Sequence, residues 1–421
     1  MFEAPFFAAM AAILAWLVNF IPRAVVQGVP LLFGSTGETL TEKSGNLNLG
    51  IPGIMYTGGI CGVIGGFLYD QSLTARATLQ VESMLEEAGT VLSNAEKTVR
   101  IGEAYAELQS GFLSIAIPLL SCLAGALLMG LIYSFLTVTL RANQNVTGLA
   151  LTTFGTGIGN FFGGSLAKLA GSNSANISLG KLAAVFHAPV VSLDGLLSDN
   201  ARLVCFLLLL MGLLGIGIAR LVLKARKRKA PTWMRVCLLI AAVLFVAIMG
   251  IDYGYMVYLA ALIALLASHL LNSTRTGLNL RAVGENPATA DAAGISVNRY
   301  KYAATCIGAM IAGLGGLYYV MDYASGIWSN NAFGDRGWLA IALVIFTVWR
   351  PGVGVAASIL FGGLYILNIY IPTGEMLALR ELYKMIPYVV TLLVLIITSI
   401  RDSRDSQPPA HLGLPYFREE R

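Results

Sequence analysis

Charge is the scarcest property of this 421-residue chain. Asp, Glu, Lys and Arg together make up 12% of it, whereas hydrophobic residues make up 56%. Soluble domains carry about 25% charged residues. A globular protein of this size leaves too much surface in water to hide so many apolar side chains. A lipid bilayer accommodates them, so the composition excludes an ordinary soluble domain and predicts an integral membrane protein.

Reactive and metal-binding side chains are also few. The cysteines are Cys61, Cys122, Cys205, Cys237 and Cys306, and the histidines are His187, His269 and His411. The cysteines lie in apolar stretches without a C-x-x-C pair, as expected of small buried apolar residues. We therefore expect no catalytic cluster and no metal site. The net charge of +5 reflects basic membrane loops, so no nucleic-acid partner is expected.

Long apolar runs are what the chain has in abundance. A transmembrane helix needs about 20 apolar residues. The candidate runs are 5–22, 49–68, 112–138, 145–164, 203–222, 235–250, 254–271, 302–322, 335–349, 353–371 and 384–400. They predict an all-α, polytopic transmembrane helical bundle of about ten to twelve crossings over residues 1–402, with a tail at 403–421. The first run lacks a basic flank, so we expect a retained helix rather than a signal peptide. Glycine clusters within the runs predict close helix packing.

The segment 24–38 is apolar but short, and it leads directly into the polar residues 38–50. Irregular polar backbone at membrane depth survives only inside protein or beside water. We therefore predict a discontinuous or re-entrant segment near residues 38–50. Asn46 and Asn48 lie there, and two roles are open for them: hydrogen bonding to a hydroxylated solute, or satisfying backbone groups that the break leaves free.

Basic residues predict the orientation of the chain. The run 224–229 contains five Lys and Arg residues and no acid, so it is predicted to lie in the cytoplasm. Counting crossings from it places loop 272–301 and the C-terminus inside, and loops 70–110 and 165–202 outside. Apolar residues recur at helical spacing within 70–110 and predict one or two amphipathic helices. These helices are expected either to cap the bundle or to dock a soluble partner.

The inner loop 272–301 contains the pattern of a short helix. Asn286 is placed to cap it, Pro287 stands at its first position, and Gly294 ends the turn. Alanines between them make the helix slim enough to enter a groove of another protein. The alternative is a solvated loop helix without a partner.

Resemblance to a known family favours a helix that enters a groove of another protein. The residues Gly284-Glu-Asn-Pro287, Ala290 and Ala293-Gly-Ile295 resemble the coupling loop of permeases in ATP-binding-cassette (ABC) importers for branched-chain amino acids, ribose-type sugars and nucleosides. In that family the loop docks on the ATP-binding subunit. The resemblance implies this coupling role for Arg281, Gly284, Glu285, Asn286, Pro287, Ala290, Ala293 and Gly294.

Two further stretches resemble the same family. Residues 41–55 are similar to its segment beside the solute path, although Pro52 stands where the family usually has an acidic residue. Residues 334–363 resemble its sugar and nucleoside branch most closely. Asn160, Phe161 and Phe162 are candidates either for stacking on a base or sugar, or for helix packing and interfacial anchoring. We expect Trp328 and Trp338 at the membrane interface, and Asp322 and Asp335 in solvent.

The resemblance implies a transport subunit rather than an enzyme. It would carry a nucleoside or a ribose-like sugar across a bacterial inner membrane. The expected partners are ATPase subunits, a second permease subunit (identical or related), an extracytoplasmic substrate-binding protein and the lipid bilayer. The chain has no G-x-x-x-x-G-K-[ST] motif, so ATP and Mg²⁺ are expected on the ATPase and no cofactor on this chain. Alternatives are a branched-chain amino acid permease and an ion-coupled transporter, although ionisable residues within the helices are few.

Overall fold

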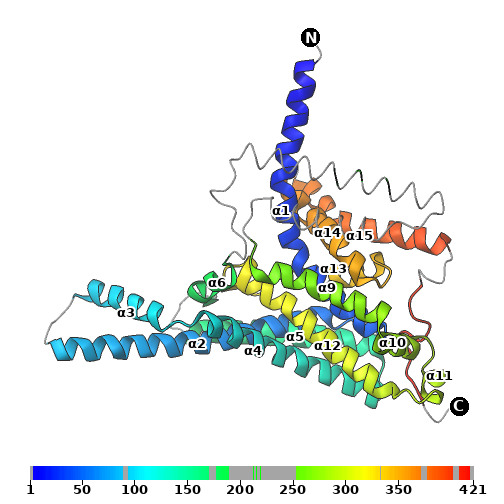
Figure 1. The fold of residues 1–421 in the computed structure, drawn as a ribbon, viewed down its shortest axis with the longest axis horizontal. Coiled ribbons are helices and arrows are strands. Elements are labelled where there is room, and N and C mark those ends of the chain that lie inside the picture. Colours follow the sequence, from blue (N-terminus) through cyan, green and yellow to red (C-terminus); the bar gives the residue numbers. More distant parts are fainter. Residues whose placement is uncertain are drawn as a thin grey trace.

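The computed structural model describes residues 3–88, 93–169, 177–188, 253–331, 333–370, 377–401 and 407–417, with three isolated positions between 189 and 252. Nearly all regular structure in these residues is helical, which confirms the predicted all-α class (Figure 1). One short antiparallel pair joins β1 (Ile177–Ser178) to β2 (Ile327–Trp328). Apart from those three positions, which fall in the predicted run 203–222, this run lies outside the described residues, as do the run 235–250 and the basic run 224–229.

The helices follow the apolar runs closely. They are α1 (Glu3–Glu42), α2 (Ile51–Ala88), α3 (Asn94–Leu108), α4 (Gly111–Ser134), α5 (Gln144–Leu169), α6 (Gly180–Phe186), α9 (Tyr255–Ser273), α10 (Arg275–Glu285), α11 (Pro287–Ala292), α12 (Val297–Tyr318), α13 (Arg336–Phe346), α14 (Pro351–Tyr370) and α15 (Leu377–Arg401). Two π-helical turns, η1 (Phe135–Thr139) and η2 (Tyr319–Tyr323), extend α4 and α12. Four of the described helical stretches, within α2, α4–η1, α9 and α12–η2, are long and apolar enough to cross a membrane.

Close helix contacts hold the centre of the bundle, where α1, α2, α4 and α12 pack together. Glycine makes the closest approaches possible. A Cβ on Gly155 of α5 would lie 2.2 Å from the Gly53 oxygen of α2, and one on Gly316 of α12 would lie 2.0 Å from the Met55 oxygen. Small residues let helix backbones approach in this way where lipid offers no hydrophobic driving force. The glycine clusters therefore have the packing role predicted for them.

The N-terminal part of the bundle differs from the prediction in one respect. Runs 5–22 and 24–38 form the single helix α1, which continues through Pro22 and Pro30, and the chain breaks only after Glu42. The polar residues of the last turns remain helical because they are buried and bond back to the helix. Thr39 Oγ1 donates to the Ser35 oxygen at 2.7 Å, one turn earlier.

Residues 70–88 of α2 and residues 94–108 of α3 are helical, as their periodicity predicted, and the two helices pair as a hairpin. The distal half of α2 and the antiparallel α3 extend beyond the other described helices (Figure 1). A small core holds the hairpin together, formed by Leu73, Ala77, Val81, Ala104 and Tyr105. Ser93 and Glu96 form a reciprocal cap at the start of α3. The base of the hairpin meets the bundle where Lys181 of α6 lies over the Tyr105 ring of α3, and its far end projects away from the other described helices.

Two predicted surface residues are in fact buried. Trp328, expected at the membrane interface, is 1% exposed and packs beneath α5, where Gly163 leaves room for its ring. Asp322, expected in solvent, is 4% exposed, with its Oδ1 2.9 Å from His187 Nδ1. Both predictions were wrong because the η2 turn and the β1–β2 pair fold this segment back onto the bundle. Asp335 is exposed, as expected, and Trp338 is also exposed, so its place at the membrane interface stays a prediction.

Candidate functional site

The predicted loop helix is present with the expected caps. Asn286 Oδ1 accepts a hydrogen bond from the Thr289 N–H at 3.0 Å, and Pro287 is the first residue of α11. Gly294 has a φ of +83°, a left-handed conformation that glycine adopts without steric cost. Residues that are close in the sequence therefore determine where this helix begins and ends, between α10 and α12.

The two faces of the α10–α11 unit differ sharply. Val283, Ala290 and Val297 are buried against one another and form a small apolar core. The opposite face is exposed and presents Glu285, Asn286, Ala288, Thr289, Ala292, Ala293 and Gly294. Apart from Glu285, its residues have short side chains or none, which suits insertion into a groove of another protein. Of the predicted coupling residues, Gly284, Pro287 and Ala290 instead face the protein interior.

The end of α10 touches the break between α1 and α2, which comprises residues 43–50. A Cβ on Gly284 would lie 2.3 Å from the Lys43 oxygen and 3.2 Å from the Gly45 nitrogen. Only glycine permits so close an approach of two backbones. Gly45 itself has a φ of +87° and forms the turn after α1. The structure thus brings together two motifs that lie some 240 residues apart in the sequence.

Side chains from neighbouring helices satisfy the backbone of the break. The Leu47 N–H donates to Gln144 Oε1 of α5 at 2.7 Å, and its oxygen accepts from the Tyr133 hydroxyl of α4. The Asn48 N–H donates to Glu38 Oε1 of α1 at 2.9 Å. Irregular backbone inside a membrane domain requires such partners. The break is therefore held from three sides.

Asn46 and Asn48 are fully buried in this conformation. Asn48 Oδ1 accepts from the Gly50 N–H at 2.9 Å, and Asn46 Nδ2 donates to Thr305 Oγ1 at 3.2 Å. Asn48 therefore does what the backbone-capping alternative predicted. Among the described residues, no group bonds to the remaining amide atoms, Asn46 Oδ1 and Asn48 Nδ2.

Trp349 belongs to this site, although the sequence did not single it out. Its indole N–H donates to a Glu42 carboxylate oxygen at the end of α1. Both Trp349 and the preceding Val348 have positive φ, at 52° and 54°. Such conformations are costly for non-glycine residues and persist where the surroundings impose them. The residue lay in a stretch already noted for its resemblance, but only the packing of α13 beside α1 reveals its partner.

The other predicted solute-path residues lie elsewhere. Asn160 exchanges two hydrogen bonds with Asn331, at 3.0 and 3.2 Å. Phe161 and Phe162 are 67% and 41% exposed on the outside of α5. Asn160 is eight residues beyond Thr152, which bonds to the Leu49 oxygen of the break, so it stands about 12 Å further along α5. The structure therefore does not bring these residues to the break.

A buried arginine was also missed. Arg336 begins α13 and is 7% exposed, and its Nη2 donates to Gln27 Oε1 at 3.1 Å. Its guanidinium lies over the rings of Tyr319 and Tyr365, at 4.6 and 4.7 Å from their centroids. A charged residue inside a membrane domain marks a functional site by default. The sequence feature that could have revealed this site is a charged residue, Arg336, within the apolar run 335–349.

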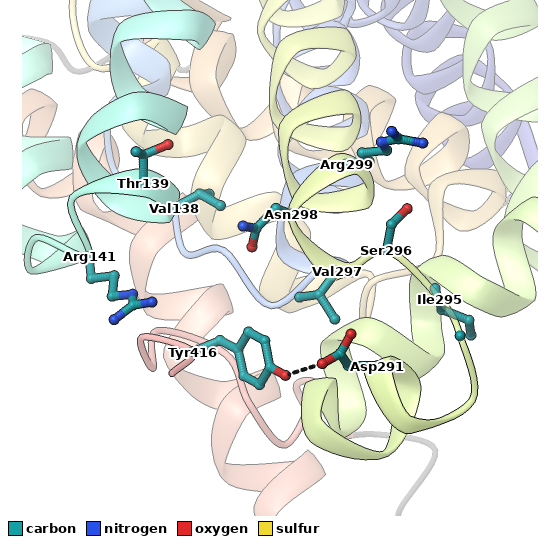
Figure 2. Close-up of a pocket in the computed structure, with 11 residues that line it drawn as sticks. Val138, Thr139, Arg141, Asp291, Ile295, Ser296, Val297, Asn298, Arg299 and Tyr416 are labelled. Carbon is teal, nitrogen blue, oxygen red and sulfur yellow. Dashed lines mark hydrogen bonds between the residues drawn. The ribbon is translucent and has the colours of Figure 1, made fainter. Parts of the chain in front are cut away.

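A pocket of about 520 Å³ opens beside α11 (Figure 2). It lies between the end of α4–η1, the α11–α12 junction and the C-terminal residues. Arg141 and Arg299 line it, and its Asp291 accepts a hydrogen bond from the Tyr416 hydroxyl at 3.0 Å. A positively charged recess therefore adjoins the exposed face of α11.

Comparison with known proteins finds a matching family and several similar permeases. The family described as "Branched-chain amino acid transport system / permease component" matches residues 20–395. The nucleoside ABC transporter permease protein NupC of Lactococcus lactis is 35% identical over 33% of this chain and 44% of its own length. The guanosine ABC transporter permease protein NupQ of Bacillus subtilis is 23% identical over 95% of this chain and 97% of its own length.

A third relative is named for a sugar. The putative glucose ABC transporter permease protein TsgC13 of Haloferax volcanii is 24% identical over 85% of this chain and 78% of its own length. No solved structure matches the chain.

Proposed function

Since the chain belongs to the family of branched-chain amino acid transport system permease components, we propose that it is the membrane-spanning permease of an ABC importer for a nucleoside. A ribose-like sugar is the second choice. The nucleoside proposal is supported by the names of two relatives, a nucleoside and a guanosine permease. The sugar is supported by the relative named for glucose.

The observation that carries the proposal is the contact of Gly284 with the break. We place α11 in a groove of an ATPase subunit, on the cytoplasmic side of a bacterial inner membrane. ATP binding there closes the two ATPase subunits and displaces α11. Because α10 meets the break backbone to backbone, the displacement reaches residues 43–50 without passing through a flexible side chain.

The break is a suitable element to open and close the solute path. Its two buried asparagine side chains each carry an amide atom that bonds to no described group. Opening the break would let a hydroxylated solute reach Asn46 and Asn48 and form hydrogen bonds to these amide atoms. A second permease subunit and a binding protein complete the proposed importer.

Ala292→Arg on the exposed face of α11 tests this proposal. In cells that also express the ATPase and binding protein, we expect uptake of labelled guanosine and co-purification of the ATPase to fall about tenfold or more, because a docked α11 would bury an unpaired charge. Ala95→Arg, the same substitution on the exposed α3, is the matched control and should preserve co-purification of the ATPase.

Normal co-purification with Ala292→Arg would contradict docking through α11. Competition by unlabelled ribose or leucine, but not by adenosine, would contradict the nucleoside assignment and favour the sugar or the amino acid.

A further inference from the structure

Residues 407–417, here called the strap, cross the end of the bundle where α11 lies. Backbone groups make most of its contacts. The His411 N–H donates to the Gly284 oxygen at 3.0 Å, and the Gly413 N–H donates to the Gly45 oxygen at 3.3 Å. The Ala410 N–H also donates to Glu285 Oε2 at 3.3 Å. Two strap residues only two positions apart therefore hold α10 and the break together.

The end of the strap is fixed by side chains. The Tyr416 ring packs on the apolar core formed by Val283, Ala290 and Val297, and its hydroxyl donates to Asp291 Oδ2 (Figure 2). The Leu414 oxygen accepts from Gln144 Nε2 of α5 at 3.4 Å. Gln144 is the same side chain that bonds to Leu47 of the break. The strap thus contacts both sides of the interface between α10 and the break, as well as α11.

Its path depends on one conformation. Gly413 has a φ of +80°, and the Leu412 N–H closes a turn onto the Pro409 oxygen at 3.0 Å. A residue with a Cβ is strained there. The strap also lies outside residues 20–395, which the family shares. It lies on the contact that the proposed function requires.

We propose that the strap is a positioning element for coupling, which keeps α11 and the 43–50 break in register so that displacement of one moves the other. This inference rests on the proposed function. Without the strap, α11 would still bind the ATPase through its exposed face, but part of its movement would be lost at the Gly284 contact. Hydrolysis would then continue with less solute moved for each ATP.

The ratio of solute transported to ATP hydrolysed tests the strap, because a purely stabilising role would not change it. The measurement uses proteoliposomes containing the full permease, its ATPase and its binding protein. We expect Gly413→Val and Tyr416→Ala to lower the ratio about tenfold. We expect Tyr416→Phe, which removes one hydrogen bond, to lower it about fivefold. Co-purification of the ATPase should be unchanged in all three.

Leu414→Ala is the matched control. Its side chain is 52% exposed and only its backbone oxygen bonds to Gln144, so the ratio should equal that of the wild type. An unchanged ratio in Tyr416→Phe and in a chain ending at residue 406 would overturn the proposal. So would equal losses of transport and hydrolysis. Failure of the wild-type chain to bind an ATPase would instead overturn the proposed function.

Discussion

Gly284 shows how much one hydrogen atom in place of a methyl group can matter. Gly284→Ala sets a Cβ 2.3 Å from a backbone oxygen that cannot rotate away, so α10 must move off the break. Overpacking of this kind costs about 1–3 kcal/mol. We expect a lower midpoint of thermal unfolding in detergent and a loss of ATP-driven uptake.

Gly102→Ala is the control for that experiment. A Cβ at Gly102 meets nothing within 4 Å, and alanine favours a helix by about 1 kcal/mol. Its thermal midpoint should be equal to that of the wild type or higher. If the two variants behave alike, the Gly284 contact does not limit stability or transport.

Single residues also mark where sequence reasoning succeeds. Asn286, Pro287 and Gly294 were placed correctly because caps and turns depend on neighbours in the chain. Trp328 and Asp322 were misplaced because their burial depends on β1 and α6, which approach from more than 130 residues away. Periodicity carries no information about such an approach.

At the scale of elements, the α2–α3 hairpin is held together by its own contacts. The Tyr105 hydroxyl donates to Asp70 Oδ1 at 2.5 Å, and Lys181 Nζ lies 4.1 Å from the centroid of its ring. Burial and the nearby carboxyl group raise the pKa of Tyr105 above its usual value, so the phenol keeps its proton and remains a donor. Tyr105 therefore ties α3 to α2 and to α6.

Tyr105→Phe removes that donor and keeps the ring. A hydrogen bond to a carboxylate contributes about 1.5–3 kcal/mol, so we expect α3 amides to exchange hydrogen about tenfold faster or more. Hydrogen exchange followed by mass spectrometry on peptides from 93–109 measures the effect. Ser83→Ala removes an exposed hydroxyl that bonds only to the Gln80 oxygen and should change nothing. Equal protection in both variants would show that the Asp70 bond does not hold the hairpin.

Element boundaries were predictable where composition changes along the chain. The runs at 112–138, 254–271 and 302–322 correspond to α4–η1, α9 and α12–η2. The continuity of α1 was not predictable, because Glu38 and Glu42 are tolerated at membrane depth only where protein or water, rather than lipid, surrounds them. The packing of other helices decides whether lipid or protein surrounds this polar turn, and that packing cannot be read from the sequence of α1.

For the molecule as a whole, the segments predicted to share a side do meet. Arg141 lies 4.6 Å from the Phe417 ring, and Arg350 shares a pocket with Glu285 and Gln407. The α3 hairpin and α6 lie together at the opposite end. The loop 272–301 and the C-terminal residues therefore share one end of the described molecule, and the cytoplasmic location of that end stays a prediction.

Labelling in intact cells tests that sidedness. Ala95→Cys on α3 should react with a membrane-impermeant maleimide, whereas Ala292→Cys on α11 should react only after lysis. Both positions are exposed on the chain itself, so reactivity depends on which side of the membrane each one faces. The wild type gives the background from its own cysteines. Labelling of Ala292→Cys in intact cells would reverse the proposed orientation.

The contact between α10 and the break is made by backbone atoms, and so are the strap bonds to Gly284 and Gly45. Backbone atoms are the same in every sequence. Mutations can therefore change the exposed side chains of α11, and with them the ATPase that this permease accepts, without altering the mechanical linkage behind them. Partner choice, through exposed α11 side chains such as Ala288 and Ala292, and force transmission, through the backbone of α10, are therefore free to evolve separately.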